Sequence, residues 1–271
     1  MVLNIAHRGA RSLAPENTMS AAQAALETGA DLWETDVAVT SDGRLILFHD
    51  DSLKRTTDAQ QRFPERSPWT FTTFTFSEIR QLDAGSWFTK TDPFGQIAAG
   101  AVSPSQQKAF QGEKVPTVEE ALVFTQESDF RINLELKRLP APMQDFPVVE
   151  RVLAMIEKLK IDTHRVIISS FNHAWLKEVQ KRNSGIEVQA LIGYYTTEPL
   201  DWGDMEFRTY NARSTLIDEA TIKEVVKKGI TVNLFTVNEE EDMRRFTAAG
   251  AEGLITDFPQ RVKRFMNGQG A

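Results

Sequence analysis

Short apolar runs alternate along this chain with segments whose hydrophobic residues recur at the spacing of a helix. The first apolar run covers residues 3–6, and the segment 16–30 that follows it has a helical pattern. Asn17 or Thr18 fits the N-cap of this helix, and Gly29 fits its end. The start of the chain therefore predicts a strand followed by a helix.

The same alternation continues to the end of the chain. A second strand is predicted at 32–39, and the turn "SDG" separates it from an extended piece at 44–50. Further strands are predicted at 130–137, 165–170, 187–192, 206–213 (a weaker candidate), 230–237 and 252–256, and further helices at 117–127, 148–160, 172–182, 218–229, 238–250 and 259–266. About eight strand–helix units are typical of an α/β fold of the TIM (β/α)8 barrel type, here a single domain covering 1–271. An open doubly wound sheet is the alternative.

One segment, residues 56–115, breaks this rhythm. It is rich in Phe, Trp, Pro, Gly and Thr and shows no clean period. Because a structureless loop of this length is uncommon in a compact domain, we predict a small inserted subdomain after the second strand, over the barrel mouth. Its aromatic residues form a core or face the substrate, and packing is the better interpretation for most of them: Trp69, Phe71, Phe74, Trp87 and Phe88.

The composition narrows the classes of function. The chain has 271 residues, 41% of them hydrophobic, and its net charge of -7 disfavours binding to nucleic acid or anionic lipid. It has no cysteine, which removes disulfides, thiolate metal sites and cysteine nucleophiles. No apolar stretch approaches the ~18 residues that span a bilayer, and no secretory signal is visible. We expect a cytoplasmic protein that acts on a small molecule without stable membrane insertion, and its oligomeric state is left open.

Charged and imidazole side chains fall at the ends of the predicted strands. In a parallel barrel, alternate strand residues point into the lumen and the carboxyl ends of the strands build the active site. Glu34 and Asp36 share one face of a strand that is otherwise typical of a protein core. Other strands contribute His7, Arg8, His49, Asn133, Glu135 and Lys137 at the same end. We therefore expect two histidines, three carboxylates and two cations to meet on one rim.

The three carboxylates predict a metal site. Crowded carboxylates raise one another's pKa unless a cation lies between them, and oxygen ligands favour a hard divalent ion, Mg²⁺ or Ca²⁺. Glu34, Asp36 and Glu135 are the candidate ligands of one such ion. Arg8 and Lys137 beside it would attract a phosphate ester. Simple ion pairs between these cations and the acids, with no metal, are the alternative.

Two histidines are candidates for proton transfer. His7 and His49 can serve as general base and general acid near neutral pH. The other polar residues near strand ends receive structural interpretations. Asp50 and Asp51 are interpreted as turn residues and His164 as a surface residue. His173 is given a structural position, with a place on the rim as the alternative, and Thr256 and Asp257 are given the cap of the final helix, with shaping of the rim as the alternative.

Ten short motifs occur in order along the chain. They are "AHRGA", "APENT", "GADLWETDV", "SDGRLILFHDDSLKRTT", "AGSWF", "VPTVEEAL", "INLELK", "SSF", "FTVN" and "ITDFP". Together they run from residue 6 to 259 and resemble the glycerophosphodiester phosphodiesterases. The resemblance implies a TIM barrel with an insertion after the second strand, a divalent ion held by the three acids, and catalysis by the two histidines. We assign Arg8, Lys137, Phe171 and Phe235 to substrate binding; Phe235 departs from the family, which often has Trp in "FTVN".

The resemblance also implies a reaction, the hydrolysis of a glycerophosphodiester to sn-glycerol 3-phosphate and an alcohol. In the mechanism usually inferred for similar enzymes, the glycerol 2-hydroxyl attacks phosphorus, a cyclic phosphate forms, and water opens it. The sequence does not decide which histidine is the base, and we favour His7. A lysophospholipase D-like activity at the same site is one alternative. A non-catalytic phosphate-binding barrel is another, although the presence of both histidines and all three acids argues against it.

Overall fold

The computed structural model describes residues 2–268 and folds them around a closed barrel of parallel strands. The strand order is β1-β9-β8-β7-β6-β5-β4-β2, and β1 pairs with β2 to close the ring, which excludes an open doubly wound sheet. The barrel strands are β1 (Leu3–Ala6), β2 (Leu32–Val39), β4 (Arg131–Leu136), β5 (Val166–Ser170), β6 (Glu187–Ile192), β7 (Thr209–Arg213), β8 (Thr231–Phe235) and β9 (Gly253–Thr256). The weaker candidate at 206–213 therefore forms β7. A short strand, β3 (Leu45–Leu47), adds to β2 in the antiparallel direction.

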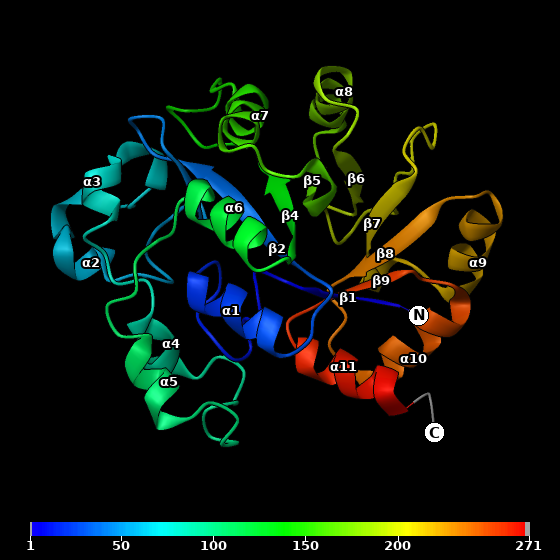
Figure 1. Cartoon of the computed structure of the whole chain (residues 1–271), viewed down its shortest axis with the longest axis horizontal. Coiled ribbons are helices and arrows are strands. Elements are labelled where there is room, and N and C mark those ends of the chain that lie inside the picture. Colours follow the sequence, from blue (N-terminus) through cyan, green and yellow to red (C-terminus); the bar gives the residue numbers. More distant parts are fainter. Residues whose placement is uncertain (1, 269–271) are drawn as a thin grey trace.

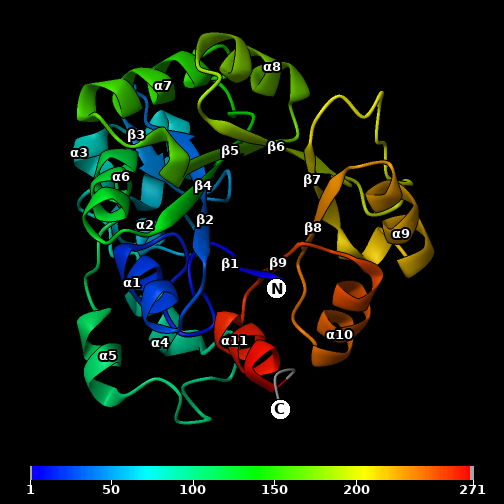
Figure 2. The ribbon, with the colours of Figure 1, turned by 45° about the vertical axis from the view of Figure 1, so that its right-hand side comes forward.

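Helices surround the ring of strands, as Figure 2 shows. They are α1 (Met19–Glu27), α6 (Val118–Glu127), α7 (Val148–Leu159), α8 (His173–Arg182), α9 (Glu219–Lys227), α10 (Glu240–Ala249) and α11 (Pro259–Gly268). Each buries one face: in α7 the buried residues are Val148, Val149, Val152 and Ile156, at helical spacing. The main core lies between strands and helices, and the predicted TIM barrel is confirmed. Among the described residues, every helix is too short or too polar to cross a membrane.

The start of α1 distinguishes the two candidate caps. Thr18 is the N-cap, because its hydroxyl accepts a hydrogen bond from the Ala21 N–H at 3.2 Å. Gly29 follows the helix with φ of 73°, a backbone conformation that glycine adopts at little cost. Asn17, the other candidate, directs its side chain to Asp36 on β2 instead. A residue that fits a helix cap by its type is thus buried against β2 instead.

Residues 56–115 form a set of short helices beside the barrel, as Figure 1 shows. They are α2 (Ala59–Arg62), α3 (Phe76–Ile79), α4 (Ser86–Thr91) and α5 (Pro104–Ala109), with 3₁₀ turns η1 (Pro64–Arg66) and η2 (Phe71–Thr73). Phe71, Phe74 and Phe88 are buried, which confirms packing for these three. Trp69 and Trp87 are half-buried against the same clusters. That the segment is an inserted subdomain over the barrel mouth stays a prediction.

Candidate active site

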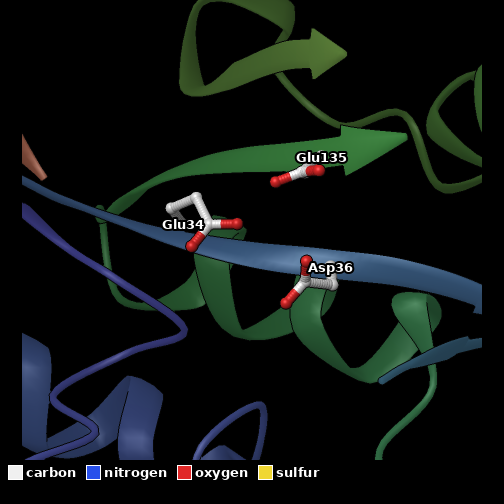
Figure 3. A group of neighbouring side chains, drawn as sticks. All are labelled: Glu34, Asp36 and Glu135. Atoms are coloured by element: carbon white, nitrogen blue, oxygen red, sulfur yellow. The ribbon is translucent and has the colours of Figure 1, made fainter. Parts of the chain in front are cut away.

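Three carboxylates meet inside the barrel, as Figure 3 shows. Glu34 and Asp36 lie two residues apart on β2, so both point to the same face, and Glu135 lies on β4. The parallel register places Asp36 directly beside Glu135. One oxygen of each carboxylate lies within 4.8 Å of the other two, which suits the ligands of a single cation. The structure therefore brings together the three acids that the sequence pattern singled out.

Asp36 is the best compensated of the three. Its Oδ1 lies 3.4 Å from Nζ of Lys137, and its Oδ2 lies 3.4 Å from Nε of Arg8. Asn17 also donates a hydrogen bond from Nδ2 to this Oδ2 at 2.9 Å. Burial favours the neutral acid, but Lys137, His49 and Arg8 together hold the pKa of Asp36 far below its usual range. The alternative of simple ion pairs therefore describes this one carboxylate.

Among the described residues, Glu34 and Glu135 form no such ion pair, and Arg8 and Lys137 offset their charges only in part. Burial, followed by the charges of Asp36 and Glu135, raises the pKa of Glu34 well above its ordinary value. Burial and Asp36 raise the pKa of Glu135 to about 7. Glu34 accepts a hydrogen bond from the Arg8 backbone N–H at Oε2 (2.9 Å), whereas its buried Oε1 has no partner among the described residues. A divalent cation would satisfy this oxygen and remove the repulsion, so these acids fit the metal that their pattern implies.

A tight turn after β1 carries His7 and Arg8 into the site. Arg8 has φ of 54° and Gly9 has φ of 78°, both in the left-handed region. A β-carbon at Gly9 would lie 2.6 Å from the backbone of Ala21, so only glycine lets the turn pack on α1. The Gly9 N–H donates to the carbonyl oxygen of Glu34 at 3.2 Å. These contacts hold the histidine and the arginine next to the acids of β2.

Each candidate catalytic histidine is paired with a carboxylate. Nδ1 of His7 lies 2.7 Å from Oδ1 of Asp257, and Nδ1 of His49 lies 2.6 Å from Oδ1 of Asp50. Asp257 follows β9, whereas Asp50 is the next residue after His49. A carboxylate at Nδ1 fixes the orientation and tautomer of the ring and leaves Nε2 as the atom that exchanges a proton. The two pairs thus have the same arrangement, although different parts of the chain build them.

The charge states of the first pair differ from those of free side chains. Burial, followed by Arg8, lowers the pKa of His7 to about 4, although Asp257 acts in the opposite direction. Burial of Asp257 favours its neutral form, but His7 and Arg11 hold the pKa of this carboxyl below its usual range. At neutral pH the pair is therefore an uncharged imidazole beside an ionised carboxylate, which is the state of a general base.

Both candidate phosphate-binding cations already contact protein oxygens. Lys137 donates from Nζ to the carbonyl oxygen of His49 at 3.0 Å, in addition to its ion pair with Asp36. Arg8 donates from Nη1 to Oε1 of Glu16 at 2.8 Å. A phosphate would therefore meet cations whose positions are already set, which lowers the entropy cost of binding it.

The far side of the rim is aromatic. Phe171 follows β5 and Phe235 ends β8, and their ring centroids lie 6.1 Å apart in an edge-to-face arrangement. Tyr194 lies 5.1 Å from Phe171, and Tyr195 lies 5.0 Å from Tyr194. The tyrosines are 64% and 60% exposed, so the series runs from a strand end to solvent. We call Phe235, Phe171, Tyr194 and Tyr195 the aromatic row; the guanidinium of Arg213 lies 5.1 Å from the centre of the Phe235 ring.

Known proteins are similar to this chain in sequence and in fold. The sequence model of the glycerophosphoryl diester phosphodiesterase family matches residues 7–261. The chain belongs to this family. A glycerophosphodiester phosphodiesterase of Caldanaerobacter subterraneus is 33% identical over 261 residues, which are 96% of each chain. One of Bacillus altitudinis is 34% identical over 267 residues, which are 95% of each chain.

Solved structures of the glycerophosphoryl diester phosphodiesterase family have the same fold. A crystal structure under this family name from Silicibacter pomeroyi has a TM-score of 0.79 at 26% identity and covers 100% of this chain and 94% of its own. A phosphodiesterase of Oleispira antarctica, solved with the product sn-glycerol-3-phosphate, has a TM-score of 0.76 at 23% identity and covers 97% of this chain and 96% of its own. The second likeness shows the fold alone.

The structure gives two polar residues partners that the sequence interpretation did not assign to them. Asp257, expected by default to cap the last helix, binds His7 instead, so the default is corrected in favour of its alternative place at the rim. Asp50, interpreted as a turn residue, binds His49. The adjacency of Asp50 to a strand-end histidine was an available signal. Asp257 offered no comparable signal, because it lies 250 residues from its partner.

The two remaining histidines pair with none of the carboxylates named above. His164 is exposed, as expected. Nε2 of His173 lies 3.0 Å from the carbonyl oxygen of Leu191, and its ring lies 5.3 Å from that of Phe207. Both structural interpretations are confirmed.

A cavity of about 520 Å³ lies at the opposite end of the barrel, where the strands begin. Its lining includes Leu3, Arg131, Glu187, Thr209 and Thr231. Because chemistry in TIM barrels takes place at the carboxyl ends of the strands, we assign this cavity no part in the site. Arg131 and Glu187 form an ion pair there at 3.0 Å, which provides a control pair at the far end of the strands from the three acids.

Proposed function

We propose that this chain hydrolyses glycerophosphodiesters to sn-glycerol 3-phosphate and an alcohol. The observation that carries the proposal is the presence of two histidine–carboxylate pairs on the same rim as three acids, two of which are uncompensated. Membership of the family supports the substrate class. The product bound in the Oleispira antarctica phosphodiesterase is the phosphate ester that this reaction would release.

Glu34, Asp36 and Glu135 would hold one divalent cation. Because all three ligands are carboxylate oxygens, the metal would be Mg²⁺ or Ca²⁺. When bound, such an ion lowers the pKa of a contacting hydroxyl and offsets negative charge on a phosphoryl oxygen. Asn17 and the Arg8 backbone N–H keep the carboxylates of Asp36 and Glu34 in place through hydrogen bonds of 2.9 Å each.

The histidines would move the protons. His7, neutral because its pKa is lowered to about 4, takes the proton of the glycerol 2-hydroxyl at Nε2 while the oxygen attacks phosphorus. His49, oriented by Asp50, protonates the alcohol oxygen as its bond to phosphorus breaks. In the second step the roles reverse: His49 takes a proton from water, and His7 protonates the 2-oxygen as the cyclic phosphate opens. Each histidine then returns to its starting state.

The remaining side chains would bind the substrate. Arg8 and Lys137 hold the phosphoryl oxygens, and their contacts with Asp36 keep both cations beside the acids. Phe171 and Phe235 form an apolar wall for the carbon skeleton.

A coupled assay for glycerol 3-phosphate tests the proposal directly. The purified protein is given glycerophosphocholine, glycerophosphoethanolamine and glycerophosphoinositol, with a chelator or with added Mg²⁺ or Ca²⁺. We expect release of glycerol 3-phosphate that stops in chelator and returns with one of the two ions. Absence of release from every substrate with either ion would refute the function.

One observation favours a second activity, the lysophospholipase D-like cleavage of lysophospholipids. The exposed end of the aromatic row, Tyr194 and Tyr195, offers an apolar surface at which an acyl chain could lie. Comparing glycerophosphocholine with lysophosphatidylcholine distinguishes the two. We expect the shorter substrate to be turned over faster, and the reverse ranking would favour the lipid.

A further inference from the structure

Three arginines converge on one buried carboxylate, Glu16, in the loop between β1 and α1. Arg8 binds its Oε1 at 2.8 Å, and Arg11 binds its Oε2 at 2.8 Å. Arg55 binds both oxygens, at 2.7 and 2.9 Å. The Glu16 side chain is only 3% exposed. Its role is not explained by the helix that follows, because Thr18 already caps α1.

Two of these arginines continue to the histidine pairs. Arg55 binds Asp50 through Nε at 2.6 Å, and Asp50 holds His49. On the other side, Nη1 of Arg11 lies 3.6 Å from Oδ1 of Asp257, which holds His7. Carboxylates and guanidiniums therefore alternate without a break from one histidine to the other. We call the residues between them, Asp257, Arg11, Glu16, Arg55 and Asp50, the Glu16 chain.

We propose that Glu16 is a positioning residue that keeps both histidine–carboxylate pairs in place at once. The inference rests on the proposed function, because it takes His7 and His49 as the proton-transferring groups. Glu16 does not contact the reacting atoms in this scheme. It acts through Arg11 on one pair and through Arg55 on the other.

The charges explain why one residue can affect both histidine–carboxylate pairs. Burial favours the neutral form of Glu16, but Arg55, Arg8 and Arg11 lower its pKa to about 2, so it is ionised at any working pH. Arg8 and Arg55 share its Oε1, which brings two guanidiniums close together. Without the negative charge these cations repel one another and lose their fixed geometry. Asp257 and Asp50, the carboxylates at the two ends of the Glu16 chain, then no longer hold the imidazoles in one orientation.

The Glu16 chain also joins loops that are distant in the sequence. Arg55 lies 39 residues from Glu16, and Asp257 lies 250 residues from His7. These loops follow β1, β3 and β9, and local contacts alone do not fix their relative positions. A buried bidentate Arg–Glu contact restricts both distance and angle, which suits an element that sets geometry.

Glu16→Gln is the main variant, because the amide keeps the shape and removes the charge. We expect kcat to fall about 10- to 100-fold, as for other residues that orient a catalytic ligand. KM should rise as well, because Arg8, which we assign to phosphate binding, loses its contact with Glu16. Glu16→Asp keeps the charge and should recover part of the loss. Glu187→Gln is the matched control, since it breaks a Glu–Arg pair at the opposite end of the barrel and should leave kcat unchanged.

Variants on the two sides of the Glu16 chain distinguish a positioning role of Glu16 from a general effect on stability. Arg55→Gln should disturb His49 and spare His7, and Arg11→Gln should do the reverse. Proton NMR of the imidazole Nδ1–H signals reports each histidine without any substrate, and His7→Ala and His49→Ala assign the two signals. Glu16→Gln should shift both signals, whereas Glu187→Gln should shift neither. If Glu16→Gln fails to fold, the two arginine variants carry the same test.

Kinetic coupling gives a second readout. In a His49→Ala background, Arg55→Gln should cause no further loss of kcat, because Arg55 and Asp50 then have no histidine to orient. Full additivity, or wild-type imidazole signals in Glu16→Gln, would overturn the inference. If the wild-type protein hydrolyses no glycerophosphodiester but the signals respond as expected, the proposed function fails and the positioning role stands.

Discussion

The rim of the barrel has a charged half and an aromatic half. The charged half comes from the ends of β1, β2 and β4 and the turn after β3, and it comprises His7, Arg8, Glu34, Asp36, His49, Glu135 and Lys137. The aromatic half is the aromatic row, from β5, β8 and the loop after β6. In the charged half nearly every side chain contacts another charged group, whereas the row ends in tyrosines that are 64% and 60% exposed.

This difference separates two tasks. Buried charges are stable only with partners, so a change in the charged half propagates to the groups that compensate it. Exposed rings make fewer obligatory contacts, so a change there stays local. We therefore expect substitutions in the charged half to alter turnover and stability, and substitutions in the aromatic half to alter substrate preference.

The largest expected effect is the loss of a histidine. His7→Ala and His49→Ala should each lower kcat by about 10²- to 10⁴-fold, the usual contribution of general acid or base catalysis, and leave the melting temperature nearly unchanged. The exposed His164→Ala is the control and should keep full turnover. A His49→Ala variant with near-normal kcat would place the chemistry elsewhere.

Removing one uncompensated acid should separate stability from activity. Glu34→Gln should abolish cation binding and turnover, yet in chelator it should melt about 2–4 °C above the wild type, the shift that ~1 kcal/mol produces in a chain of this size. The reason is the raised pKa of Glu34, which burial and then the neighbouring carboxylates cause. Calorimetry with and without Mg²⁺ measures both effects. A variant less stable than the wild type in chelator would contradict the repulsion.

The pH dependence of stability should show the same repulsion. In chelator the folded-state pKa of Glu135 is raised to about 7, above the ~4.3 of an unfolded glutamate, so the folded state binds the proton more tightly. The stability that protonated Glu135 gives to the folded state is present below about pH 4 and is lost as the pH rises through about 7. Between about pH 5 and about pH 8, the melting temperature should therefore fall more steeply with pH for the wild type than for Glu135→Gln. Equal slopes would argue against the shift, and added cation should stabilise most at the highest pH.

The smallest effect is expected in the aromatic half. Phe235→Ala should raise KM by less than about tenfold and keep kcat close to wild type, since a ring contact is worth about 1 kcal/mol. Tyr195→Ala, at the exposed end of the row, should matter only for substrates with long or bulky leaving groups. Steady-state kinetics on two head groups of different size measures this. A loss confined to kcat would remove the distinction between the halves.

Much of the fold could be predicted from local patterns. The apolar run at 32–39 and its two carboxylates were enough to predict a strand with Glu34 and Asp36 on one face, because side chains alternate along any strand. Residue types placed the start of α1 at Asn17 or Thr18 and its end at Gly29. The extended piece predicted at 44–50 contains β3, whereas the short helices of 56–115 were less visible, because elements of three to six residues show too few periods to recognise.

The partners of these residues could not be predicted in the same way. Asn17 looked like a helix cap and Asp257 looked like another, since both residue types favour that position. Only the closure of the barrel, through β1 with β2 and β9, brings them to Asp36 and His7. Their roles in the reaction stay proposals.

The sequence by itself determined which residues lie at strand ends and which face they share, because strand and helix periods are local properties of the chain. The tertiary structure alone decided which charges neutralise each other: Asp36 is paired, Glu34 and Glu135 are not, and Glu16 joins three arginines. These pairings, like that of His7 with Asp257, whose members lie 250 residues apart, depend on distances between segments that are distant in the sequence. No periodic pattern encodes such distances, since they result from the packing of the whole barrel.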